Sequence, residues 1–153
     1  MSVEERLAAL GHALPDTSAP AHAYLDCVRD GDLLYLSGKG PRQADGTRRS
    51  GKVGATVSLE LAREDAVFAG LQLLAVLRRE LGTLDRVERI VKVLGMVNAA
   101  PDFTRHPEVI DGCSQLLIDA FGERGRHARS AIGVGSLPGN MTVEIEMIVR
   151  APA

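Results

Sequence analysis

The fold is decided by three consecutive stretches near the C-terminus: RSAIGVG at residues 129–135, SLPGN at 136–140 and MTVEIEMIV at 141–149. The first and third stretches alternate between two kinds of side chain. Strands alternate in this way when their two faces meet different surroundings. The sequence therefore predicts two β-strands joined by a short turn.

One charged group stands out on the first of these predicted strands. Arg129 shares its face only with very small residues, Ala131, Gly133 and Gly135, whereas Ile132 and Val134 face the other way. Small residues beside a fixed charge leave open space. The guanidinium group is a planar fork of donors that fits a carboxylate. This pattern favours a pocket for a small carboxylate, and the alternative is a solvated or salt-bridged surface arginine.

The second strand carries two carboxylates on one face, Glu144 and Glu146, opposite an apolar face formed by Val143, Ile145 and Met147. These carboxylates are either functional groups or simply ion-pair partners of Arg129.

The composition is that of one globular domain over residues 1–153. Hydrophobic residues make up 45% and charged residues 25%, which is enough for a substantial core. The net charge of −2, the 3% of aromatic residues and the absence of tryptophan argue against nucleic acid as a ligand.

The sequence also indicates the cellular compartment and whether a cofactor is expected. No apolar run reaches membrane-spanning length and the N-terminus lacks a signal-peptide pattern, so we expect a cytoplasmic protein without membrane contact. Cys27 and Cys113 are widely spaced and are expected to be reduced thiols. None of the four histidines has metal-ligand spacing, so neither a metal nor a cofactor is expected.

Hydrophobic periodicity, caps and turns predict the order of elements along the chain. An N-terminal helix and connector occupy residues 1–20, and the core spans 21–150. Within the core we expect a loop at 38–54, with a turn at Asp45-Gly46. The predicted helices are 4–10, 58–81 and 108–121, and the predicted strands are 24–28, 33–37, 87–97, 129–135 and 141–149.

This order predicts an α+β fold, in which a mixed sheet carries the two main helices on one face. Arg129, Glu144 and Glu146 are expected to project from the other face, whose middle is apolar. Two helices cannot cover both faces of such a sheet. The protein is therefore expected to self-associate through the uncovered face, with clefts between subunits.

The first two predicted strands, 24–28 and 33–37, hold two further candidates for the ligand site. Ser37 ends a predicted strand and could donate a hydrogen bond to a ligand, or it could be a turn serine bonded to nearby backbone. Tyr24 begins the preceding strand as either a core residue or a pocket wall.

At this point the sequence resembles a known family. Ala-Arg-Ser at 128–130, Leu-Pro at 137–138 and Val-Glu-Ile-Glu at 143–146 are similar to the signature of the Rid (reactive intermediate deaminase) or YjgF family. That family is also known as endoribonuclease L-PSP. The segment Leu36-Ser37-Gly38, with Tyr24 before it, is similar too. The likeness covers about residues 21–150 and points to a longer branch of the family.

The resemblance implies a chorismate-mutase-like fold and a homotrimer with ligand clefts between subunits. It implies hydrolysis of 2-enamine or 2-imine acids to 2-keto acids and ammonia. Glu144 would orient or activate water, and Arg129 would hold the substrate carboxylate. Ser37, Gly38, Tyr24 and Ala131 would line the site.

Two departures from the family pattern keep other functions open. Ala131 stands where deaminase members commonly have cysteine, and the polar residue of the last helix has no clear counterpart in 108–121. A non-catalytic protein that binds 2-keto acids is the main alternative. An endoribonuclease is less favoured, because the chain has low aromatic content, no net positive charge and no histidine pair for acid–base work.

Overall fold

Helices and strands alternate along the part of the chain that the structure, a computed structural model, describes: residues 1–17, 20 and 23–153. None of the helices within it combines the length and the apolar character needed to cross a membrane. The helices are α1 (Val3–Ala9), α2 (Leu59–Leu81) and α3 (His106–Phe121), and the strands are β1 (Cys27–Asp30), β2 (Leu33–Lys39), β3 (Arg89–Asn98), β4 (Ala128–Val134) and β5 (Val143–Arg150).

The longest helix, α2, has the ends and the buried stripe that its sequence predicts. Ser58 accepts a hydrogen bond from the Leu61 amide at the start, and Gly82 ends the helix with φ of 83°. The alanine-rich stripe has no exposed surface, which confirms that α2 packs closely on the layer beneath it: Ala62, Ala66, Ala69, Leu73 and Val76.

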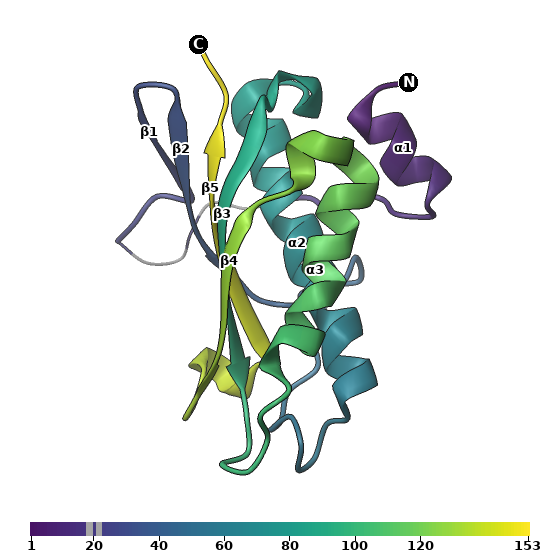
Figure 1. Cartoon of the computed structure of the whole chain (residues 1–153), viewed down its shortest axis with the longest axis vertical. Helices are drawn as coiled ribbons and strands as arrows, with labels where there is room; N and C mark the ends of the chain where they lie inside the picture. Colours follow the sequence, from purple (N-terminus) through teal and green to yellow (C-terminus); the bar gives the residue numbers. More distant parts are fainter. Residues whose placement is uncertain (18–19, 21–22) are drawn as a thin grey trace.

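The five strands form one mixed sheet in the order β1-β2-β5-β3-β4. Only β3 and β4 are parallel, so the last strand in the chain, β5, lies between β2 and β3. Both long helices lie on the same side of this sheet (Figure 1). The predicted α+β architecture is thus confirmed, and we call the side away from α2 and α3 the open face.

Several predicted boundaries are wrong by two or three residues, and two of them bear on the site. The first strand begins at Cys27, so Tyr24 precedes the sheet instead of starting it. Helix α3 begins at His106, two residues early, because Pro107 fits the first turn, where an amide hydrogen is not needed. Parts of the predicted connector (18, 19) and of the start of the predicted core (21, 22) lie outside the described residues.

The predicted face of Arg129 is also wrong. Arg129 pairs with Val93, a core residue, and its side chain reaches α3 on the helical side of the sheet. The physical reason is the close approach of α3. A Cβ on Gly133 would lie 2.3 Å from Nε2 of His106, so only small residues fit beneath the helix. Ile132 therefore points to the open face, where it is 46% exposed.

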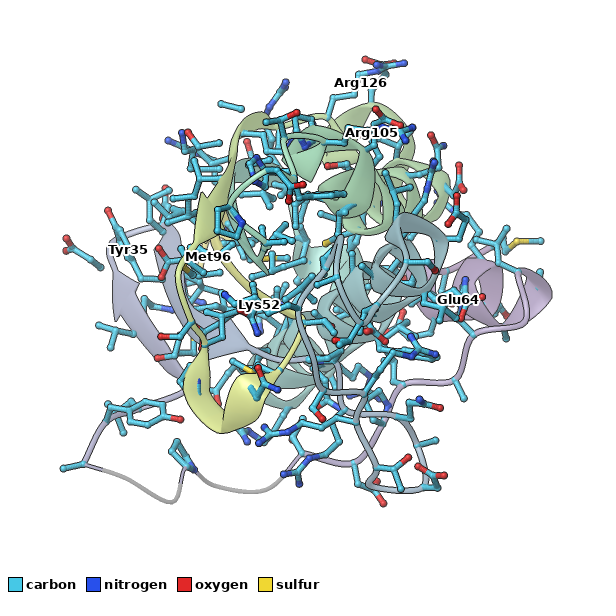
Figure 2. All side chains as sticks on the ribbon, turned by 90° about the horizontal axis from the view of Figure 1, so that it is seen from below. Tyr35, Lys52, Glu64, Met96, Arg105 and Arg126 are labelled. Atoms are coloured by element: carbon cyan, nitrogen blue, oxygen red, sulfur yellow. The ribbon has the colours of Figure 1, made fainter. Side chains whose placement is uncertain are left out.

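The open face carries the carboxylates of β5 among apolar side chains. Glu144 and Glu146 project from it between the buried residues of the same strand. Figure 2 shows Tyr35 and Met96 on this side, away from Glu64 of α2. The face is therefore apolar with a few charges, and neither of the two long helices in the described part of the chain covers it.

Candidate functional site

A cavity of about 610 Å³ opens where the end of β2 and the start of β5 meet the loop at 40–48. This volume is typical of a small-molecule site. Four of the predicted site residues line it: Tyr24, Ser37, Gly38 and Glu144. The remaining lining residues are Asp16, Thr17, Pro20, Lys39, Gly40, Arg42, Arg48, Gln72, Pro138 and Met141.

Glu144 lies directly over Gly38. A Cβ built on Gly38 would be 2.9 Å from Cδ of Glu144, so glycine is what allows the carboxyl group to sit there. Burial raises the pKa of Glu144, and the nearby carboxylate of Glu146 raises it further. A carboxylate with a raised pKa is a stronger base than one in open water, so this group is suited to accept a proton.

Ser37 and Gly38 lie at an irregularity of the sheet. The pairing of β2 with β5 shifts between Leu36 and Lys39, so both residues lie where the strand changes register. The Ser37 hydroxyl donates to the carbonyl of Leu25 at 2.6 Å. Of the two sequence interpretations, the structure therefore shows the serine bonded to nearby backbone. Its hydroxyl holds Leu25, next to Tyr24, against β2.

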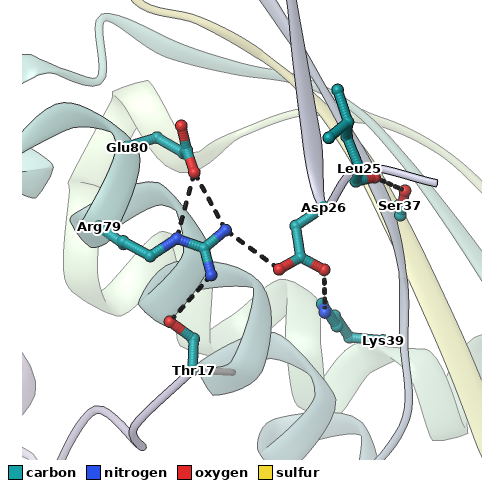
Figure 3. A network of polar contacts seen from close by, with 7 residues as sticks. All are labelled: Thr17, Leu25, Asp26, Ser37, Lys39, Arg79 and Glu80. Carbon is teal, nitrogen blue, oxygen red and sulfur yellow. Dashed lines mark hydrogen bonds and ion pairs between the residues drawn. The ribbon is translucent and has the colours of Figure 1, made fainter. Parts of the chain in front are cut away.

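A buried network of ion pairs links the segment before β1 to β2 and α2 beside the cavity (Figure 3). The Asp26 carboxylate has no exposed surface and accepts from Lys39 at 2.5 Å and from Arg79 of α2 at 3.0 Å. Burial alone would raise the pKa of Asp26, but the hydrogen bonds from Lys39 and Arg79 outweigh it and lower the pKa. The charge of Lys39 is thus neutralised beside the cavity.

Arg129 and Ala131 do not join these groups in the protomer. Nη1 of Arg129 donates to Asp111 at 2.7 Å and to the Ser114 hydroxyl at 3.1 Å, both on α3. The Ser114 hydroxyl also lies 2.9 Å from Nε2 of His127. Arg129 is therefore salt-bridged on the helical side, as the alternative interpretation of its sequence position had it, and its partner is Asp111.

Sequence reasoning did not predict the other lining residues as part of a site, among them Arg42, Arg48 and Gln72. A signal for the two arginines was present, since they lie three residues before and after Asp45 in the predicted turn. Gln72 gave no signal, because it belongs to a helix whose pattern indicated only core packing.

The family model for "YjgF/chorismate_mutase-like, putative endoribonuclease" matches residues 4–149, and the five-stranded sheet with helices on one face agrees with it. The chain belongs to this family. Its YjgF-type fold therefore extends over nearly the whole sequence.

Three proteins show how similar this YjgF-family chain is to individual relatives. Protein TCP17 from Trypanosoma cruzi is 38% identical over 149 residues, which cover 97% of this chain and 93% of that protein. A crystal structure of a protein of unknown function from Agrobacterium tumefaciens is 36% identical, with a TM-score of 0.92 and coverage of 99% and 93%. RidA from an Antarctic Psychrobacter is 21% identical, with a TM-score of 0.59 and coverage of 91% and 99%, a likeness of fold alone.

A half-buried lysine organises the turn next to the cavity in this YjgF-family structure. Nζ of Lys52, labelled near the middle of Figure 2, donates to Oδ1 of Asn98 at 2.9 Å and to the carbonyl of Gly135. Nδ2 of Asn98 in turn donates to Oδ1 of Asn140 at 3.0 Å. The turn that carries Pro138 to Met141 is thereby tied to the end of β3. Among the described residues, no group of three or more potential ligands is arranged to hold a metal.

Proposed function

We propose that this protein hydrolyses reactive 2-enamine or 2-imine acids to 2-keto acids and ammonia, with Glu144 as the base. One observation carries the proposal. A carboxylate with a raised pKa lies over Gly38, in a polar cavity that Ser37 and Tyr24 also line. These are residues that the family resemblance implies for this reaction.

For this reaction the protein needs to do little more than position a water molecule and accept its proton. An enamine first becomes the imine by protonation at C3, and C2 of the imine is then electrophilic. Glu144 takes a proton from the attacking water as a C–O bond forms at C2 and the second electron pair of the C=N bond moves to nitrogen, which then receives that proton from Glu144. The resulting carbinolamine passes its hydroxyl proton to nitrogen through Glu144, and the C–N bond breaks as the C=O bond of the 2-keto acid forms and ammonia leaves. Positioning and base catalysis suffice for such a step.

The substrate carboxylate needs a cation, and Arg129 is our candidate. Within one protomer Arg129 and Glu144 are on opposite faces of the sheet, so we propose that Arg129 comes from a neighbouring subunit of a homotrimer. In support, β4 is an edge strand and the Arg129 side chain is 22% exposed. Arg129→Lys keeps the charge but loses the two-pronged geometry, so it would weaken 2-keto acid binding.

The trimer itself has a direct test. Sedimentation of the wild type should give three times the mass of one chain at micromolar concentration. Ile132→Glu should weaken assembly on the order of tenfold or more, because it puts a charge on the open face. Leu61→Glu is the control, since Leu61 is similarly exposed, at 40%, but belongs to α2. A monomeric wild type would contradict the trimer.

The proposed reaction is tested by coupling the protein to a pyridoxal-phosphate enzyme that releases 2-aminoacrylate. We expect the protein to speed pyruvate formation well above the spontaneous rate. Calorimetry with 2-oxobutyrate should be run on the same sample. Binding without any acceleration would refute hydrolysis and establish a 2-keto acid binding protein, the function that Ala131, in place of a thiol, would favour.

A further inference from the structure

Two arginines, Arg42 and Arg48, stand at the two ends of a tight loop over residues 43–47, which we call the hairpin. The Gln43 amide donates to the Thr47 carbonyl at 2.8 Å, and the Gly46 amide donates to the Gln43 carbonyl at 3.0 Å. Gly46, with φ of 84°, supplies the left-handed residue that such a turn requires. Arg42 directly precedes Gln43 and Arg48 directly follows Thr47, so the closed loop brings both arginines back to one cavity wall.

Both arginines line the cavity that contains Glu144, and different elements hold them there. The side-chain amide of Gln72, on α2, donates to the carbonyl of Arg42 at 2.9 Å. The guanidinium of Arg48 lies over Gly139, because a Cβ at that position would be 2.1 Å from Nη2. The hairpin is thus fixed between α2 and the turn before β5.

Neither of the two positive charges is in contact with a carboxylate in the described part of the chain. Neither guanidinium forms an ion pair there, whereas the neighbouring Lys39 and Arg49 are paired with Asp26 and Asp65. The undescribed residues are serine, alanine, alanine and histidine, none of which carries a carboxylate. Two like charges on the wall of one cavity repel each other. An arrangement of this kind is suited to receive an anion between the two side chains.

The arginine pair and Glu144 contact different walls of the cavity. Glu144 lies over Gly38 at the end of β2, and Arg48 lies over Gly139 in the turn before β5. The cavity of about 610 Å³ is far larger than a three-carbon imino acid. A longer substrate could place its C2 atom at Glu144 and a distal group at the arginines.

We infer that Arg42 and Arg48 bind a second carboxylate, so that the preferred substrate is a 2-imino acid with an acidic side chain. This inference rests on the proposed function, because it takes Glu144 as the reaction centre and Arg129 as the anchor of the first carboxylate. It makes the arginine pair a determinant of specificity and assigns it no part in the chemical step.

The test compares two 2-keto acids of equal length by calorimetry. 2-Oxoglutarate and 2-oxovalerate both have five carbons, but only the first has a distal carboxylate. The wild type should bind 2-oxoglutarate on the order of tenfold more tightly, as expected for hydrogen bonds between charged groups. In the double variant Arg42→Gln/Arg48→Gln this preference should vanish, with 2-oxovalerate affinity unchanged.

A charge-matched double variant controls for long-range electrostatics. Arg105→Gln/Arg126→Gln removes two exposed arginines near α3 (Figure 2), each paired with a glutamate three residues away, and should keep the full preference. Equal binding of both acids by the wild type would overturn the inference, and so would an equal loss of both in Arg42→Gln/Arg48→Gln. If the wild type bound neither acid, the proposed function would fail as well, which distinguishes the two failures.

Discussion

Glu144→Gln is expected to slow imine hydrolysis about a hundredfold, the scale of one general-base contribution, while 2-keto acid binding stays nearly normal. Glutamine has almost the same shape as glutamate and still forms hydrogen bonds, so the contact with Gly38 is preserved. What disappears is the basic oxygen that accepts the proton of water. The coupled assay and calorimetry on the same preparation separate the two effects.

Glu146→Gln is the matched control, because Glu146 projects from the same face two residues away but does not line the cavity. The hydrolysis rate at neutral pH should persist. Since the Glu146 charge helps to raise the pKa of Glu144, its removal lowers that pKa. The base works only when deprotonated, so the acidic limb of the rate profile should move to lower pH. Equal losses of rate and binding in Glu144→Gln would instead make Glu144 a structural residue.

Gly112→Ala is expected to lower the free energy of unfolding by about 3 kcal/mol, at the upper end of the cost of overpacking. Gly112 lies on α3 where this helix contacts α2, and a Cβ there would be 2.2 Å from the backbone carbonyl oxygen of Arg63. A backbone carbonyl cannot rotate away from the added Cβ as a side chain can, so α2 and α3 must move apart. Thermal denaturation should show a Tm roughly 5 to 10 °C lower.

Gly70→Ala in α2 is the control variant for Gly112→Ala. Its Cβ would meet Sγ of Cys113 and Cδ2 of Leu116 at 3.0 Å, which are ends of side chains that can shift. Alanine is intrinsically better than glycine in a helix by about 1 kcal/mol, so this variant should be nearly neutral. If Gly112→Ala were as stable as Gly70→Ala, the close contact of α2 with α3 would not limit stability.

Most of the fold could be predicted because its signals are local. Ser58 and Gly82 mark the ends of α2, and the alternation of β5 separates its buried residues from Glu144 and Glu146. These features depend on periodicity and capping, which need no knowledge of distant residues.

The face of Arg129 could not be predicted, because it depends on a contact between distant segments. Alternation alone assigns Ile132 to the core, but the closeness of α3 reverses the assignment by leaving room only for Ala131 and Gly133. Of the candidate site, the cluster of Tyr24, Ser37, Gly38 and Glu144 was found through the family resemblance. Arg42 and Arg48 were not. Their positions on either side of the predicted turn were a signal, but only the closed loop shows that both line one cavity.

The central place of β5 in the sheet has a consequence for how the chain folds while it is being synthesised. Residues 143–150 are made after the other four strands, yet β2 and β3 pair only through them. Until they leave the ribosome, the N-terminal hairpin and the β3–α3–β4 unit have no strand to join them. Each then exposes strand edges and apolar surface that attract chaperones or other nascent chains. The native sheet therefore cannot form until β5 has emerged from the ribosome.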